Sequence, residues 1–320
     1  MDIAQLSTQI NQTLNTLRYG ENPAELYEPI RYIMSLGGKR IRPLMVLLAA
    51  KMYDDDVENV LLPAAAVEVF HNFTLMHDDI MDQAPLRRGK PTVHQKWNST
   101  IAILSGDVML VKAYDYLNKV TPRYAKRIVH LFNRTAKEVC EGQQLDMDFE
   151  RRVQVAFDEY LNMINVKTSV LLAASLQMGA ILGGALERNQ NLLYEFGRKL
   201  GLAFQVQDDY LDAFGDPEKF GKQVGGDIKS NKKTFLLIHA LETADGSQLQ
   251  ELESHLQSAA PDKVDRVLSI FRECKVDEWA MELKDQFMKE ALTHLDDIAV
   301  VSSRKEPLKR LALYLMQRQS

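Results

Sequence analysis

Apolar residues recur at helical spacing along nearly the whole chain, and segments that alternate strictly between apolar and polar residues are absent from it. Glycine and proline, the residues that break helices, number only 16 and 10 in 320 residues. We therefore expect an all-α protein that folds as a single domain over residues 1–320, with about ten or more helices. The clearest helical stretches are 43–53, 64–82, 138–148, 157–186 and 191–214.

The stretch Thr168–Leu186 carries no charge over 19 residues, which is the length of a membrane span. It also contains two serines, a glutamine and three glycines, which favours a helix buried inside a large domain.

The first residues, MDIAQLSTQINQ, lack the basic and apolar regions of a signal peptide. Two cysteines without a CxxC motif favour a reducing compartment. We expect a cytoplasmic protein without stable membrane insertion.

The chain is mildly acidic, with 39 Lys and Arg against 44 Asp and Glu and a net charge of −5. This balance gives no overall attraction to nucleic acid or to anionic membranes. Nucleic acid is therefore not an expected partner. Any binding of phosphate must come from local clusters of basic residues.

The motif HDDIMD, residues 77–82, ends an otherwise apolar helical stretch. Asp78 and Asp82 are four residues apart, so a helix places both carboxylates on one side. His71 and Thr74 fall on the same side. A solvated polar stripe is the alternative, but the apolar neighbours indicate burial, and buried carboxylates need a counter-charge. Mg²⁺, which binds one or two carboxylates together with substrate phosphates, would supply that charge.

A second helical stretch, 201–216, repeats this pattern with Gln205, Asp208, Asp209 and Asp212 on one polar face. An amphipathic surface helix is the alternative, but such a face usually includes Lys or Arg, and this one has neither. Two acidic helices suggest two walls of carboxylates that face each other across a cavity. Several Mg²⁺ ions between them could hold a diphosphate.

Basic residues gather at three places that also contain glycine. A Gly37-Gly38 turn precedes one predicted helix, an arginine pair follows the first acidic motif, and a third group lies in or just after the glycine-rich segment 215–231. Helix N-termini and arginine forks suit phosphate oxygens, although each cation alone could be an ordinary surface residue. The cations are Lys39, Arg40, Arg42, Arg87, Arg88, Lys222 and Lys232.

Lys167 stands at the start of the uncharged stretch, so we expect it at the edge of the interior. A lysine that reaches out to solvent is the alternative. In a functional reading, Lys167, Thr168 and Gln205 would offer dipoles to a cationic intermediate. The polar run 141–146 is a weaker indication of the same cavity wall.

The motifs GGKRIRP, HDDIMDxxxLRRGKP, EGQxxD, KT and FQVQDDYLD, followed by GK, occur in this order between Gly37 and Thr234. With them the chain resembles the trans-isoprenyl diphosphate synthases. The resemblance implies the isoprenoid synthase (prenyltransferase) fold, an all-α bundle around a central cavity, usually as a homodimer. It also implies Mg²⁺-dependent head-to-tail condensation of isopentenyl diphosphate with an allylic diphosphate, either dimethylallyl, geranyl or farnesyl diphosphate.

The resemblance further implies roles for single residues. About three Mg²⁺ ions would be bound with substrate, and the metal positions match Asp78, Asp82, Asp208 and, through water, Asp212. The positions that hold isopentenyl diphosphate match Lys39, Arg42, His71 and Arg88. Those that hold the allylic diphosphate match Arg87, Lys167, Lys222 and Lys232. The catalytic positions at the reacting centre match Lys167, Thr168 and Gln205.

In this family, product length is associated with the bulk of the residues that precede the first acidic motif. Phe73 stands five residues before Asp78, and Phe70 stands eight before. Thr74, four before, is not aromatic, so the floor is less constricted than in members with two aromatic residues there. We therefore expect geranylgeranyl diphosphate, the C20 product, rather than the C15 product farnesyl diphosphate.

The chain departs from the family's pattern at Asn231, where Gly is common before the lysine, and at Phe235-Leu236, where Leu-Pro is common. Asparagine tolerates a positive φ better than most residues. We therefore expect the turn before Lys232 to survive the exchange.

Three alternative functions remain open from the residues. An HD-type metal phosphohydrolase could use His71, His77 and Asp78, but it would leave the second acidic helix without a role. A terpene cyclase would share one aspartate motif but would lack a second diphosphate site. A non-catalytic helical partner subunit would have no need of two carboxylate stripes.

Overall fold

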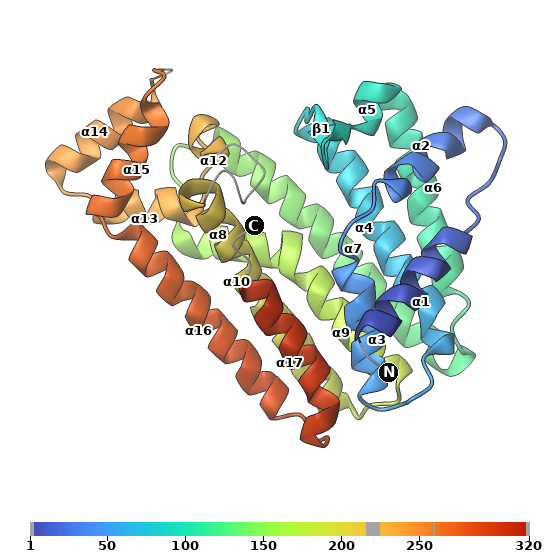
Figure 1. The fold of residues 1–320 in the computed structure, drawn as a ribbon. Coiled ribbons are helices and arrows are strands. Elements are labelled where there is room, and N and C mark those ends of the chain that lie inside the picture. The colour runs from blue at the N-terminus through green and yellow to red at the C-terminus, as the bar shows by residue number, and fades with distance from the viewer. Residues whose placement is uncertain (1–2, 216–224, 259, 318–320) are drawn as a thin grey trace. The chain divides into compact units, whose positions relative to one another are not determined.

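The computed structural model describes residues 3–215, 225–258 and 260–317, and nearly all of its regular structure is helical (Figure 1). The expectation of an all-α fold is thereby confirmed. By its internal contacts the chain divides into two compact units. The first comprises Met1–Asn133, Ala174–Asn191 and Ala299–Leu308, and the second comprises Arg134–Ala173, Leu192–Ile298 and Lys309–Ser320. The single domain over residues 1–320 stays a prediction.

The first unit is built around a long apolar helix. Its first elements are α1 (Ile3–Thr16), α2 (Ala24–Ser35), α3 (Ile41–Lys51), the 3₁₀ turn η1 (Glu58–Val60) and α4 (Leu61–Met81). An antiparallel hairpin of β1 (Leu86–Arg87) and β2 (Lys90–Pro91) follows, and then α5 (Val93–Lys96) and α6 (Ser99–Leu117). Because α1, α2, α3 and α6 all contact α4, most of its faces are buried (Figure 1).

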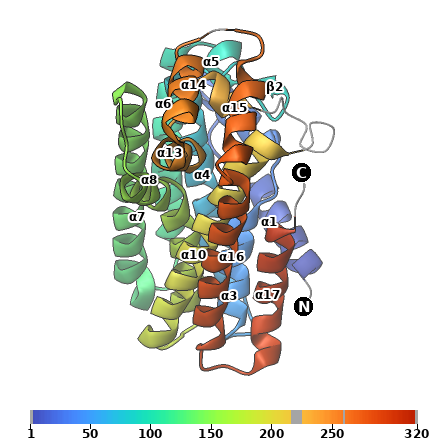
Figure 2. The same ribbon diagram turned by 90° about the vertical axis from the view of Figure 1, so that its left-hand side faces the viewer.

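The second unit contains the elements of the C-terminal half. The helices α7 (Pro122–Arg151), α9 (Val170–Leu182), α10 (Glu187–Phe214) and α17 (Ser302–Met316) contribute residues to both units. To the second unit alone belong α8 (Phe157–Ile164), the π-helical turn η2 (Asn165–Ser169), α12 (Gly226–Lys229), α13 (Phe235–Thr243), α14 (Gly246–Leu256), α15 (Lys263–Glu273) and α16 (Val276–Asp296). The buried helix α13 contacts α8, α15 and α16 (Figure 2).

Glycines set how closely helices of the first unit approach. Gly179 on α9 lies against the carbonyl oxygen of Val46 on α3, so closely that a Cβ there would clash with it. Gly106 on α6 likewise leaves room for the ring of His77 on α4. The first contact sets the approach of α9 to α3, and the second holds α4, which carries the first acidic motif, against α6.

The apolar stretch that we predicted over 157–186 consists of α8, η2 and α9 and ends at Leu182. By length and hydropathy alone, the helical residues Phe157–Leu182 could cross a membrane. However, 72% of the most apolar window in this stretch is buried inside the protein. The burial supports the interpretation as a core helix. Gly184, with a φ of 81°, stands two residues after Leu182, where the helix ends.

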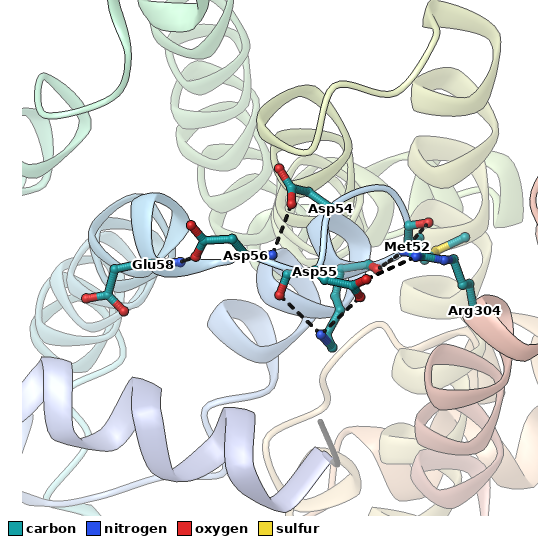
Figure 3. Close-up of polar contacts among 7 residues, drawn as sticks. Met52, Asp54, Asp55, Asp56, Glu58 and Arg304 are labelled. Atoms are coloured by element: carbon teal, nitrogen blue, oxygen red, sulfur yellow. Dashed lines mark hydrogen bonds and ion pairs between the residues drawn. The ribbon is translucent and has the colours of Figure 1, made fainter.

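Arg304 on α17 braces the C-terminal end of α3 within the first unit (Figure 3). Its Nη1 donates to the carbonyl oxygens of Lys51 and Met52 at 3.1 and 3.5 Å, and its Nη2 lies 3.2 Å from Oδ2 of Asp55. The carbonyl groups at the end of a helix carry partial negative charge, which an arginine neutralises. The ion pair with Asp55 thereby holds the acidic turn after α3 against α17.

Candidate functional site

The first acidic motif lies at the C-terminal end of α4. The backbone N–H of Asp82 donates to the carbonyl oxygen of Asp78 at 2.8 Å, so the two residues stand one helical turn apart. Asp82 is exposed, and Asp78 is partly buried. Two carboxylates at the negative end of a helix dipole repel each other and the helix end, which makes this a favourable place for a cation.

The middle aspartate of this motif has a different environment. Asp79 is 2% exposed, and it accepts three hydrogen bonds of 2.7 to 3.0 Å from Nε and Nη2 of Arg87. These bonds tie the end of α4 to β1. The sequence pattern predicted Arg87 as a phosphate ligand but not this ion pair, because the pairing depends on how the chain turns after α4.

Arg42, His71 and Arg88 come together in the first unit. Nη1 of Arg42 lies 3.1 Å from Nε2 of His71, and Nη1 of Arg88 donates to the carbonyl oxygen of Gly37. A Cβ at Gly38, where φ is 135°, would lie 2.8 Å from Nη2 of Arg88, so the glycine allows this approach. Burial, followed by the charges of the surrounding arginines, holds the pKa of His71 well below its usual value. His71 is therefore a neutral acceptor within a cluster of cations that attracts an anion.

Neighbouring cations in the turn before α3 have different surroundings. Arg40, with a φ of 50°, is buried and lies 2.5 Å from Oε1 of the buried Glu68. Lys39 is exposed. Burial lowers the pKa of Arg42 to about 10. Arg40 is thus neutralised internally, whereas Lys39 and Arg42 are the candidates for a phosphate.

The aspartates of the second acidic motif, on α10 in the second unit, also differ in their surroundings. Asp208 is exposed and Asp212 is partly buried, whereas Asp209 is 6% exposed. Oδ2 of Asp212 accepts the backbone N–H of Asp227 at 3.0 Å. Burial and then the charge of Asp227 raise the pKa of Asp209 to about 7. Carboxylates crowded in this way are stabilised by a divalent cation.

A chain of hydrogen bonds joins the predicted catalytic residues Thr168 and Gln205. Oγ1 of Thr168 donates to Oε1 of Gln205 at 3.3 Å, and Nε2 of Gln205 donates to Oδ1 of Asp209 at 2.8 Å. The buried hydroxyl of Tyr160 donates to Oδ2 of Asp209 at 2.5 Å. Because both carboxyl oxygens of Asp209 accept, one from Tyr160 and one from Gln205, the amide nitrogen of Gln205 points toward Asp209 and its amide oxygen is left for Thr168.

Lys167 and Lys232 share one carboxylate. Nζ of Lys167 lies 2.5 Å from Oδ2 of Asp146, and Nζ of Lys232 lies 3.8 Å from the same oxygen. Burial alone would raise the pKa of Asp146, but the two ammonium groups hold it below its usual range. Lys167 belongs to the π-helical turn η2, and Gly142 packs so closely on its backbone that a Cβ would clash there. Such π-helical turns are frequent at functional sites.

Some site residues were not predicted from the sequence, and one prediction lies outside the described residues. Asp227 stands in the glycine-rich segment 215–231, where α12 forms, and an acidic residue directly after Gly225-Gly226 was an available signal. Tyr160 is 49 residues from Asp209 in sequence, and no motif connects them. Lys222 lies outside the described residues.

Both acidic motifs provide hard oxygen donors, which suit Mg²⁺. They do so as carboxylates one helical turn apart, Asp78 with Asp82 and Asp208 with Asp212. Within residues 3–215, 225–258 and 260–317, no group of three or more His, Cys, Asp or Glu side chains is placed to hold a metal ion.

The residues that we associate with product length lie one or two turns before Asp78 on α4. Phe73 is 9% exposed, and its ring centroid lies 4.7 Å from that of His77 and 5.6 Å from that of the buried Phe70. The hydroxyl of Thr74 donates to the carbonyl oxygen of His71 at 2.8 Å. Phe73 is thus packed between two aromatic rings, and Thr74 is held against its own helix.

Comparisons with known proteins agree with these motifs. A family model described as polyprenyl synthetase matches residues 23–274. The geranylgeranyl diphosphate synthase of Methanosarcina mazei is 38% identical over 320 residues, which cover 99% of this chain and 97% of that protein. A crystal structure of a geranylgeranyl pyrophosphate synthase superposes with a TM-score of 0.95 at 43% identity and covers 100% of both chains.

A second solved structure, geranylgeranyl pyrophosphate synthetase from Pyrococcus horikoshii, superposes with a TM-score of 0.93 at 34% identity. It covers 99% of this chain and 98% of that one. Similarity at this identity over whole chains is found between members of one family. The chain therefore belongs to the polyprenyl synthetase family and is an all-α prenyltransferase.

Proposed function

We propose that this enzyme condenses isopentenyl diphosphate with an allylic diphosphate to make geranylgeranyl diphosphate, the C20 product. The observation that carries the proposal is the similarity over whole chains to proteins named geranylgeranyl diphosphate synthase. The alternative product, farnesyl diphosphate, is not favoured by these relatives. A metal phosphohydrolase is not favoured either, because it would not explain the second acidic motif.

Asp78, Asp82, Asp208 and Asp212 are proposed to hold Mg²⁺, on the order of three ions when substrate is bound. Each acidic motif brings carboxylates one turn apart, so phosphate oxygens and water would complete the coordination of each ion. When bound, the ions would neutralise the negative charge that develops on the departing pyrophosphate. That both motifs serve the same diphosphate is part of the proposal.

The two clusters of cations are proposed to receive the two substrates. Isopentenyl diphosphate would be held by Lys39, Arg42, His71 and Arg88, the cluster in which His71 is neutral and the arginines crowd together. The allylic diphosphate would be held by Arg87, Lys167, Lys222 and Lys232. Arg87 could bind through Nη1, since Asp79 takes its Nε and Nη2 groups.

In the proposed reaction, the bond between C1 of the allylic substrate and its diphosphate oxygen breaks and leaves an allylic carbocation. The double bond of isopentenyl diphosphate attacks C1 to form the new carbon–carbon bond, and a proton then leaves to an oxygen of pyrophosphate. Thr168 and Gln205 are proposed to face the cation with oxygen dipoles, and their hydrogen bond to each other supports this pairing. The site must exclude water, because water would trap the cation as an alcohol.

The test is incubation of the purified chain with radiolabelled isopentenyl diphosphate, Mg²⁺ and each allylic primer, followed by sizing of the products. A C20 product from farnesyl diphosphate supports the proposal. Accumulation of the C15 product alone would favour the farnesyl alternative. Release of phosphate from nucleotides without any condensation would point to a phosphohydrolase, and inactivity of the chain alone would point to a non-catalytic subunit.

We also propose that the enzyme works as a homodimer in the cytoplasm. On α6, Ile103, Leu104 and Val111 are 45%, 53% and 60% exposed, and a second copy of the chain could cover these apolar side chains. Sedimentation velocity tests the assembly: a species of one chain at micromolar concentration would contradict it.

A further inference from the structure

The turn before Lys232 depends on a residue that departs from the family's pattern. Asn231 has a φ of 55°, in the left-handed region, where glycine is favoured and asparagine is tolerated. The expectation that asparagine preserves the turn is thus confirmed. Unlike glycine, asparagine also has a side chain, and both its amide nitrogen and its amide oxygen form hydrogen bonds.

Asn231, Lys263 and Leu256 form a closed group of hydrogen bonds within the second unit. Nδ2 of Asn231 donates to the carbonyl oxygen of Leu256 at 2.8 Å. Nζ of Lys263 donates to Oδ1 of Asn231 at 2.6 Å and reaches the same Leu256 oxygen at 3.4 Å. Leu256 ends α14, and Lys263 begins α15. We call this group the Asn231 clamp.

Lys263 stands where a positive charge is energetically unfavourable. Its side chain is attached to the first residue of α15, the positive end of the helix dipole, where a cation is destabilising. It is also only 6% exposed and, within the described part of the chain, forms no ion pair. Burial of a charge among neutral partners disfavours the folded state. The hydrogen bonds of Lys263 to Asn231 and to the end of α14 offset the cost of burying its ammonium group.

Packing and polar bonds together hold this turn in place. Only a small cavity of about 10 Å³ lies between the turn and the helices beside it, and Ile228 in the turn is 7% exposed. The turn contributes Asp227, Ile228, Asn231 and Lys232 to its lining, and helices α13 to α15 contribute Leu237, Leu256, Val267 and Phe271. Apolar contacts therefore seat the turn on these helices, and polar bonds at its two ends act together with that packing to position it.

Those polar bonds connect the turn to the candidate site. At its start, the backbone N–H groups of Gly225 and Asp227 bind the backbone and side-chain oxygens of Asp212 at 2.6 and 3.0 Å. At its end, the N–H of Lys232 donates to the carbonyl oxygen of Asp227 at 2.9 Å, next to the Asn231 clamp. Between these fixed ends, Lys232 directs its Nζ toward Asp146, 3.8 Å away.

We propose that Asn231 and Lys263 are positioning residues that hold Lys232 beside Asp146 and thereby set the affinity for the allylic diphosphate. The proposal rests on the proposed function, in which Lys232 binds that diphosphate. Neither residue touches substrate in this account. They act by fixing the turn that carries Lys232, so their effect is confined to the allylic substrate.

Steady-state kinetics on two variants tests this. Asn231→Gly removes the side chain but keeps the left-handed backbone, and Lys263→Met removes the cation but keeps much of the volume. Each is expected to raise KM for farnesyl diphosphate by about tenfold and to leave KM for isopentenyl diphosphate within about twofold. The double variant should match the single ones, because both remove the same contact. Asn231→Asp, which can still accept from Lys263, should restore most of the affinity.

Lys275→Gly is the matched control. Lys275 also has a left-handed backbone, with a φ of 54°, but its side chain is 74% exposed at the start of α16. This variant should leave both KM values unchanged. Three results in Asn231→Gly and Lys263→Met would each overturn the proposal. They are an equal rise in both KM values, a change in kcat alone, and kinetic constants that do not change.

Amide hydrogen exchange gives a readout that does not depend on the enzyme's activity. In Asn231→Gly and Lys263→Met, peptides that cover residues 225–234 should exchange faster than in the wild type, whereas Lys275→Gly should exchange like the wild type there. Unchanged exchange would refute the clamp even if the proposed condensation is observed. Faster exchange in a chain without condensation activity would retain the clamp and refute the proposed function.

Discussion

At the scale of single residues, one histidine illustrates how the site uses charge. His71 is partly buried beside arginines, and desolvation and their charges hold its pKa far below the usual value. It therefore stays neutral and offers Nε2 as an acceptor to Arg42. A protonated histidine would instead repel Arg42, so the same burial that builds the anion site makes the fold sensitive to acid.

The pH dependence of stability follows from His71. Below about pH 6.5, its usual pKa, the unfolded chain takes up a proton that the folded chain refuses, so stability falls as pH falls. The contribution is up to about 1.4 kcal/mol per pH unit. Thermal unfolding from about pH 8 to about pH 5 should thus show a steeper loss in the wild type than in His71→Gln. His130→Gln, at an exposed position, is the control, and equal slopes in all three proteins would contradict the prediction.

Asp78 is expected to be essential for turnover. Asp78→Ala removes a carboxylate proposed to bind Mg²⁺ and should lower kcat/KM by about a thousandfold or more. The helical circular dichroism signal should remain near that of the wild type, because Asp78 lies at the end of α4. Asp285→Ala, whose side chain is 73% exposed on α16, should keep full activity. Near-normal turnover of Asp78→Ala would refute the metal role.

Phe73 and Thr74 are expected to change product length in opposite directions. Phe73→Ala empties space between Phe70 and His77 and should shift products beyond C20, whereas Thr74→Phe should shift them toward C15. Removing a buried phenylalanine ring lowers stability by about 3 kcal/mol, so the assay belongs well below the unfolding temperature. Chromatography of the products checks both changes. An unchanged product from Phe73→Ala would remove this residue from the account.

At the scale of elements, the sequence pattern located α3, α4, α9 and α10, covered only the last part of α7, and singled out neither α6 nor α16. Apolar spacing and the acidic motifs predicted α4 and the C-terminal part of α10, since both have a buried face and a polar one. The π-helical turn η2 and the short α12 were not predicted. Each depends on a partner distant in sequence: Gly142 packs under η2, and Asp212 accepts a backbone N–H of α12.

Gly142 is therefore expected to be intolerant of a side chain. In Gly142→Ala the new Cβ would meet the backbone of Lys167, which cannot give way without distorting η2. Overpacking of this kind lowers stability by about 1–3 kcal/mol. Because η2 carries Lys167 and Thr168, kcat should also fall. Chemical unfolding and kinetics measure both effects, and Gly246→Ala, where a Cβ meets open space, should be nearly neutral.

At the scale of the whole molecule, the sequence predicted the fold class and the family, because ordered motifs on helices carry both. It also predicted which residue types would gather near α4 and α10. It could not predict which of two neighbouring residues of the same type stabilises the fold and which belongs to the site. Arg40 pairs with Glu68 while Arg42 contacts His71, and only the packing of α3 against α4 distinguishes them.

The two acidic motifs should respond together to one ligand. Inorganic pyrophosphate with Mg²⁺ is expected to stabilise the folded chain, by about 2.7 kcal/mol when the ligand is at a hundred times its Kd. EDTA should abolish the stabilisation. Asp78→Ala and Asp208→Ala should each abolish it as well, although the two residues belong to different units. Retained stabilisation in either variant, measured by thermal unfolding, would argue against a shared diphosphate.

The ion pair between Asp79 and Arg87 affects how mutational scans of this enzyme should be read. A scan of the three aspartates in HDDIMD would score all of them as intolerant. The intolerance at Asp79 would reflect a guanidinium left without its buried partner and a hairpin no longer anchored to α4. An aspartate that tolerates no replacement is therefore not, for that reason alone, a metal ligand. A loss of stability in Asp79→Leu, compared with retained stability in Asp78→Ala, would separate architecture from chemistry.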